Sequence, residues 1–137
     1  MAHHAYLLSI IVMKILVVDD EKDVEPLFRM RFRRELRNGD IDLIFAFSGE
    51  EALHQLSEHG KADVVLVLSD INMPGMTGLE LLQRIKSDPP PVPVCMMTAY
   101  DNEEYRGKAA DLDCDGYVSK PIDFGALKEK IATFKAV

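Results

Sequence analysis

Residues 64–78 read VVLVLSDINMPGMTG, an unbroken apolar run that leads into an aspartate and a loop. Apolar residues at every position of 64–68 are typical of a strand that is covered on both faces, so we expect this strand at the centre of a sheet. Asp70 stands where the strand ends, and residues 72–78 are too rich in glycine and proline to continue it. The stretch therefore predicts a buried central strand with a carboxylate at its carboxyl end.

Similar apolar runs recur along the chain and alternate with segments in which apolar residues follow helical spacing. Such alternation predicts right-handed crossovers and a parallel sheet with helices on both faces. We therefore expect one α/β domain, a three-layer sandwich of five strands and five helices. The expected strands are residues 15–18, 41–47, 64–68, 92–97 and 114–118, and the expected helices are residues 24–38, 48–60, 79–85, 102–110 and 124–134.

Local signals mark the starts of two of these helices. Asp23 is expected to cap the first helix, with Pro26 inside its first turn, where a missing N–H is tolerated. Ser48, followed three residues later by Glu51, has the form of a capping box. Both signals predict helix boundaries that the structure can test.

The composition fits a single globular domain of 137 residues with a net charge of −7. A negative chain argues against general nucleic-acid binding, which requires a basic patch. One segment is basic: five arginines lie within residues 29–37. They form either a solvated helix face or a docking surface for an acidic partner.

The start of the chain is set apart from the fold. Residues 5–13 are apolar but too few to span a bilayer, and the segment lacks the basic lead and the small-residue cleavage site of a secretory signal. We treat residues 1–12 as a tag remnant or an upstream start, and residues 13–137 as the domain. Cys95 and Cys114 have neither metal-binding nor redox spacing, which indicates buried thiols in a reducing, cytoplasmic compartment.

Polar groups stand at the ends of four of the five expected strands. Asp19 and Asp20 follow the first strand, Asp70 the third, Thr98 ends the fourth and Lys120 follows the fifth. The carboxyl ends of parallel strands meet at one edge of the sheet, so these side chains should converge there.

Carboxylates this close repel one another, and their charged forms need a cation. Mg²⁺ suits such oxygen ligands, so we expect Asp20 and Asp70 to bind it with a loop carbonyl, and Asp19 to act through water. Asp70 could then attack phosphorus as a nucleophile, with Lys120 and Thr98 contacting phosphoryl oxygens. The alternatives are a solvated turn at Asp19 and Asp20, an ordinary strand end at Thr98 and an ordinary solvated lysine at position 120.

Together, Asp19-Asp20, Asp70 in SDINMPGMTG, Thr98 and Lys120-Pro121 resemble the receiver domain of bacterial two-component response regulators, over about residues 13–137. The resemblance implies a flavodoxin-like sheet of order 2-1-3-4-5. It also implies that Asp70 accepts a phosphoryl group from a sensor histidine kinase or a phosphotransfer protein. By the same resemblance, Asp19, Asp20 and the Asn72 carbonyl serve Mg²⁺. Thr98, Tyr117 and Lys120 carry the switch, and the Lys120–Pro121 bond is expected to be cis.

A receiver of this kind would be no enzyme beyond its own phosphorylation and dephosphorylation. Its output would pass through the surface of the helix at 102–110, the strand at 114–118 and the last helix. The partner would be a separate effector or a missing C-terminal output domain, with a phosphorylation-linked homodimer as a further option. We expect no direct contact with nucleic acid or membrane.

Other classes of function fit the residues less well. A phosphatase of the haloacid-dehalogenase type also forms an aspartyl phosphate, but it places its nucleophile after the first strand and a second aspartate two residues later. Here the aspartate follows the third strand, and position 72 is Asn. A nucleotide- or flavin-binding loop would need glycines after the first strand, where this chain is acidic. An interaction domain that is never phosphorylated remains the third alternative.

Overall fold

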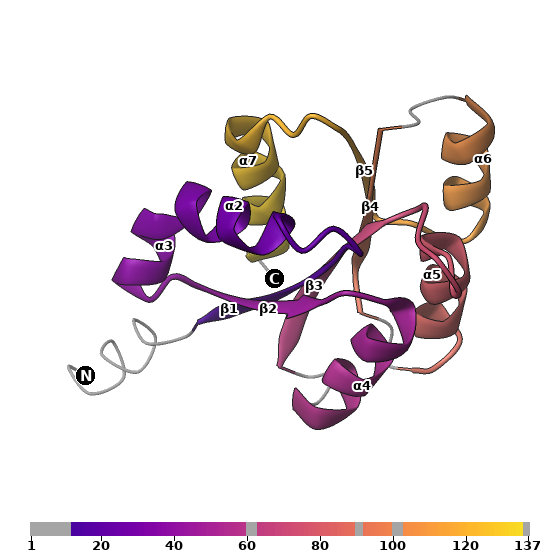
Figure 1. The fold of residues 1–137 in the computed structure, drawn as a ribbon, viewed down its shortest axis with the longest axis horizontal. Helices are drawn as coiled ribbons and strands as arrows, with labels where there is room; N and C mark the ends of the chain where they lie inside the picture. The colour runs from indigo at the N-terminus through magenta and orange to yellow at the C-terminus, as the bar shows by residue number, and fades with distance from the viewer. Residues whose placement is uncertain (1–11, 60–62, 90–91, 100–102, 136–137) are drawn as a thin grey trace.

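The computed structural model describes residues 12–59, 63–89, 92–99 and 103–135. Its centre is a parallel sheet in the order β2-β1-β3-β4-β5, which confirms the expected order (Figure 1). β3 lies in the middle, as its wholly apolar sequence predicts. The strands are β1 Met13–Val18, β2 Ile41–Ala46, β3 Val64–Asp70, β4 Val94–Thr98 and β5 Gly116–Ser119.

Helices cover both faces of the sheet and complete the three layers. On one face α2, α3 and α7 pack over Ile15 and Val17 of β1, while α4, α5 and α6 lie on the face of Leu16 and Val18. This alternation along β1 follows from the two-residue period of a strand. The helices are α2 Val24–Arg31, α3 Arg33–Asn38, α4 Gly49–His59, α5 Gly78–Lys86, α6 Glu103–Asp111 and α7 Phe124–Lys135.

The described residues form six helices rather than the expected five, because the first one divides at Phe32. The backbone there departs from helical geometry, with φ −102° and ψ 17°. The Phe32 ring is fully buried, stacked on Phe28 at 5.8 Å and edge-on to Phe124 at 6.0 Å. The apolar spacing of the two halves is nearly continuous, so the break was not visible in the sequence.

The two expected helix starts have different outcomes. The backbone N–H of Glu51 donates to Ser48 Oγ at 3.0 Å, and Glu51 Oε2 accepts from the N–H of Phe47 at 3.3 Å. The capping signal at Ser48 is therefore confirmed, although Glu51 reaches Phe47 rather than Ser48. Asp23 occupies the cap position of α2, but its side chain makes no capping hydrogen bond. Its helical backbone angles, φ −65° and ψ −16°, differ from the extended geometry of a capping residue.

Three strands end one or two residues further along the chain than the sequence predicted, β1 ends at Val18 as predicted, and β2 ends one residue earlier, at Ala46. β3 extends to Asp70, β4 to Thr98 and β5 to Ser119, so Asp70 is the last residue of its strand. The expectations for residues 1–11 lie outside the described residues. Within the described part of the chain, none of the helices has the length and apolar content needed to cross a bilayer.

Candidate functional site

Three carboxylates meet at the carboxyl edge of the sheet. Oxygens of Asp19, Asp20 and Asp70 lie within 4.8 Å of one another. Asp19 is held directly after β1 by its N–H, which donates to the Ala46 carbonyl of β2 at 3.1 Å. Asp19 and Asp70 are almost completely buried, and Asp20 is half-buried. The strand ends thus bring together the three acids that the sequence singled out.

Lys120 joins this cluster from the end of β5. Its backbone N–H donates to the Thr98 carbonyl at 2.8 Å, and the Lys120–Pro121 bond is cis, as expected. The Lys120 Nζ lies 2.6 Å from Asp19 Oδ2 and 3.4 Å from Asp70 Oδ2. The ammonium group therefore lies between two buried carboxylates, at the edge of the sheet where the sequence predicted that these side chains converge.

Burial and charge act on this cluster in opposite directions. Burial raises the pKa of Asp70, the positive charge of Lys120 lowers it, and the negative charge of Asp19 raises it further. The net pKa lies above that of an ordinary aspartate. Burial lowers the pKa of Lys120, but the hydrogen bond to Asp19 and the charge of Asp70 outweigh it, and the net pKa is raised. Lys120 thus stays protonated at neutral pH, while the Asp70 carboxylate is a charge that the surroundings stabilise only in part.

Gly78 shapes the loop that follows Asp70. Its N–H donates to the Ile71 carbonyl at 2.7 Å, which closes the loop against the end of β3. A Cβ at position 78 would overlap the Asp70 carbonyl oxygen and lie 2.7 Å from Ile71 Cα. Only glycine fits this close approach. In the sequence, Gly78 is one residue of a glycine-rich loop, and that pattern does not predict this contact with the end of β3. Asn72 lies exposed at the start of the same loop.

Thr98 and Tyr117 lie on neighbouring strands and on the same face of the sheet. Thr98 is fully buried, and the register pairs it with Ser119 and pairs Met96 with Tyr117. Tyr117 is half-buried, with the Arg106 guanidinium of α6 lying 4.4 Å from its ring centre. Sequence reasoning missed Arg106, since nothing in a polar helix marks which residue lies over the tyrosine.

A parallel sheet with clustered carboxylates and a lysine at its carboxyl edge defines a class of protein, and comparison with known sequences identifies that class. The sequence profile of the response regulator receiver domain matches residues 15–132. The chain therefore belongs to the response regulator receiver domain family.

Particular relatives differ in size. The chain is 34% identical over 121 residues to chemotaxis protein CheY-3 of Vibrio cholerae, with 87% of this chain and 88% of that protein covered. It is also 34% identical over 119 residues to a cyclic di-GMP phosphodiesterase of Thermotoga maritima, covering 87% of this chain but only 30% of that protein. The crystal structure of a response regulator receiver domain protein from Clostridium thermocellum superposes with a TM-score of 0.79 over 89% of this chain and 93% of that one. At 24% identity this last likeness supports the fold alone.

Proposed function

We propose that Asp70 accepts a phosphoryl group from a phosphohistidine of a sensor kinase or phosphotransfer protein. The observation that carries the proposal is the placement of Lys120 Nζ, 2.6 Å from Asp19 and 3.4 Å from Asp70, beside three clustered carboxylates. An Asp70 oxygen would form a bond to phosphorus while the bond from phosphorus to the donor nitrogen breaks and its electron pair leaves with the imidazole. The product is an acyl phosphate on Asp70.

The donor set fits a divalent cation that prefers oxygen ligands. Asp19, Asp20 and Asp70 would hold Mg²⁺ together with the Asn72 carbonyl, in line with the acidic cluster. When bound, the ion would offset the charge of the carboxylates and of the incoming phosphoryl group. Lys120 would then exchange part of its contact with the carboxylates for a phosphoryl oxygen, and the Thr98 hydroxyl would donate to another.

The function is tested by incubating the protein with acetyl phosphate and Mg²⁺ and measuring its intact mass. One added phosphoryl group, removed by hydroxylamine as expected for an acyl phosphate, supports the proposal. Fast turnover of unrelated phosphate esters would favour the phosphatase alternative instead. The word phosphodiesterase in the name of the Thermotoga relative describes a protein of which this chain matches 30%, so we do not extend that activity to this chain.

Partners follow from the same proposal. The phosphoryl group would come from a kinase or phosphotransfer protein, and the signal would pass to an effector, to an output domain or to a second copy of the chain. The surface of α6, β5 and α7 would carry it. Cys95 and Cys114 are both unpaired, in line with a reducing compartment such as the cytoplasm.

Mg²⁺ binding is expected to depend on Asp20. Replacement Asp20→Asn removes one charged oxygen ligand, so calorimetric titration should show Mg²⁺ affinity falling about tenfold or more. His54→Ala is the control, because His54 is exposed on α4 and its ionic contact is with Glu58 of the same helix. Equal affinity in wild type and Asp20→Asn, or a loss in His54→Ala, would place the metal elsewhere.

The switch is expected to run from Thr98 to Tyr117. A phosphoryl group adds roughly −1.5 to −2 charges at the sheet edge. Thr98 would move toward it, and the Tyr117 ring would enter the space on the shared face, as a shift between two existing populations. Nuclear magnetic resonance spectra with beryllofluoride, a phosphoryl mimic, should show α6 and β5 signals shifting in wild type and much less in Thr98→Ala. Equal shifts in both proteins would leave Tyr117 as a half-buried strand residue without a switching role.

A further inference from the structure

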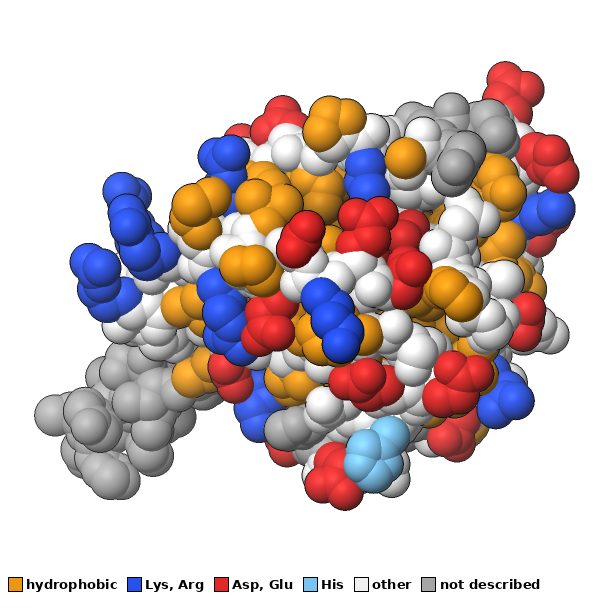
Figure 2. Space-filling view, in the orientation of Figure 1, with side chains coloured by type: hydrophobic (Ala, Val, Ile, Leu, Met, Phe, Trp, Pro, Cys, Tyr) orange, Lys and Arg blue, Asp and Glu red, His pale blue; other side chains and the backbone are white. Residues whose placement is uncertain are grey.

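Four exposed arginines gather at one end of the molecule, away from the acidic site. Arg31 ends α2, and Arg33, Arg34 and Arg37 belong to α3. Figure 2 shows the blue side chains of this region standing out at the left edge of the molecule, where Figure 1 draws α3. The chain as a whole has a net charge of −7. A local patch of positive charge on such a chain therefore calls for a specific explanation.

These arginines lack acidic partners within the described residues. The neighbouring basic groups are paired: Arg29 lies 3.0 Å from Glu25, and Lys128 lies 3.1 Å from Glu35. No ion pair of the described part of the chain uses the four exposed arginines. Glu35, whose pKa the charge of Arg34 helps to lower, is the acid that lines the groove with them, so four arginines face one carboxylate that is already paired with Lys128.

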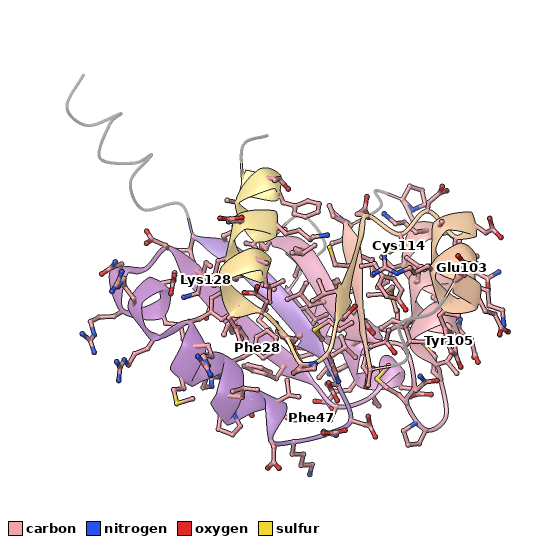
Figure 3. All side chains as sticks on the ribbon, turned by 90° about the horizontal axis from the view of Figure 1, so that it is seen from above. Phe28, Phe47, Glu103, Tyr105, Cys114 and Lys128 are labelled. Atoms are coloured by element: carbon pink, nitrogen blue, oxygen red, sulfur yellow. The ribbon has the colours of Figure 1, made fainter. Side chains whose placement is uncertain are left out.

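The arginines line a concave surface rather than a convex one. A groove of about 440 Å³ runs along α3, and its lining includes Met30, Arg31, Arg33, Arg34, Arg37 and Lys128. Lys128 forms the wall on the α7 side, held by Glu35 and by the Phe32 ring at 5.2 Å from its Nζ. Figure 3 shows Lys128 on the side of α7 that faces α2 and α3. The groove is thus built from packed elements.

The groove lies at the opposite edge of the sheet from the phosphoacceptor site. α3 ends at Asn38, and Asp40 then hydrogen-bonds through its carbonyl to the N–H of Met13, at the amino end of β1. Asp19 and Asp70 stand at the carboxyl ends of the strands. Binding in the groove would therefore leave the phosphoryl-accepting edge free.

We propose that this arginine groove docks an acidic polypeptide segment that carries an apolar side chain. Guanidinium groups pair with carboxylates through two parallel hydrogen bonds, and arginine and methionine are enriched at protein interfaces. Met30 supplies the apolar contact, since 59% of its surface is exposed beside the arginines. The proposal is independent of the phosphoacceptor function.

The apolar surface of Met30 favours a polypeptide over a nucleic acid as the occupant of the groove, because a peptide can place an apolar side chain among its carboxylates. Glu35 places a negative charge inside the groove, and although burial raises the pKa of Glu35, a backbone hydrogen bond and the Lys128 contact lower the net pKa. The carboxylate is therefore ionised and repels phosphates and peptide carboxylates alike, so the exposed Met30, rather than charge, distinguishes the two ligands.

The test measures binding of a short fluorescent peptide of alternating Glu and Leu by anisotropy. The double replacement Arg34→Glu/Arg37→Glu should weaken binding by roughly tenfold. Arg84→Glu/Lys108→Glu is the matched control, because it makes the same change in net charge on exposed faces of α5 and α6. It should change the affinity by less than about twofold. Unchanged far-ultraviolet circular dichroism and an unchanged urea unfolding midpoint would show that both variants fold.

If both double variants bind the peptide equally weakly, the effect is due to net charge alone and the proposal is overturned. Absence of peptide binding to the wild type would also overturn it. A single-stranded oligonucleotide that displaces the peptide, and binds more tightly through the same arginines, would assign the groove to nucleic acid. Met30→Ala should weaken the binding of the Glu-Leu peptide but not the binding of a peptide of alternating Glu and Ser. Equal effects on both peptides would overturn the apolar contact.

Discussion

Asp70→Asn is expected to abolish phosphoryl incorporation, the largest functional effect of any single replacement in this chain. The amide keeps the size of the side chain but has no anionic oxygen to attack phosphorus. Lys120 keeps its 2.6 Å contact with Asp19, so the surroundings should remain folded. Intact mass after incubation with acetyl phosphate and Mg²⁺ should show one added phosphoryl group in wild type and none in the variant.

Asp63→Asn provides the matched control for this experiment. Asp63 is exposed and directly precedes β3, at the end opposite Asp70. The same chemical change there should leave incorporation at the wild-type level. Incorporation that persists in Asp70→Asn, or that is lost in Asp63→Asn, would show that the phosphoryl group is carried by another residue.

The site could be predicted from the sequence because its residues stand at the ends of strongly apolar runs. Residues 64–68 allow little besides a buried strand, so Asp70 had to emerge at the carboxyl edge of the sheet. The same argument places Asp19 and Thr98. Parallel strands bring such ends together whatever the details of the helices. The convergence of the acids therefore follows from topology alone.

Contacts between distant side chains could not be predicted in the same way. Lys120 and Asp19 are separated by 101 positions, and the sequence gives no sign of which carboxylate the ammonium group prefers. The break at Phe32 depends on rings contributed by two other positions, and the cation–π contact of Arg106 depends on how α6 lies over β5. The missing cap at Asp23 is a matter of local backbone angles. The Lys120 contact, the break at Phe32 and the Arg106 contact are decided by packing, which local patterns do not encode.

Gly78→Ala is expected to have the largest effect on stability, because the glycine meets backbone rather than a side chain that could move. The added Cβ would overlap the Asp70 carbonyl oxygen and crowd Ile71 Cα at 2.7 Å. Relieving this overlap must shift the loop or the end of β3, and overpacking of this kind costs about 1–3 kcal/mol. Alanine restricts the unfolded chain and returns at most about 1 kcal/mol. The clash therefore outweighs the gain.

Gly107→Ala separates the clash from the general effect of replacing a helical glycine. Gly107 lies in α6, and a Cβ there would meet nothing within 4 Å. Its replacement should stabilise the protein by up to about 1 kcal/mol through helix propensity. The urea concentration at the unfolding midpoint should therefore fall in Gly78→Ala and rise in Gly107→Ala. Because the shift in Gly78→Ala begins at the Asp70 carbonyl, it should also slow phosphorylation by acetyl phosphate, whereas Gly107→Ala should not. If the unfolding midpoint of Gly78→Ala equals that of the wild type, the close approach of the loop to β3 does not constrain the site.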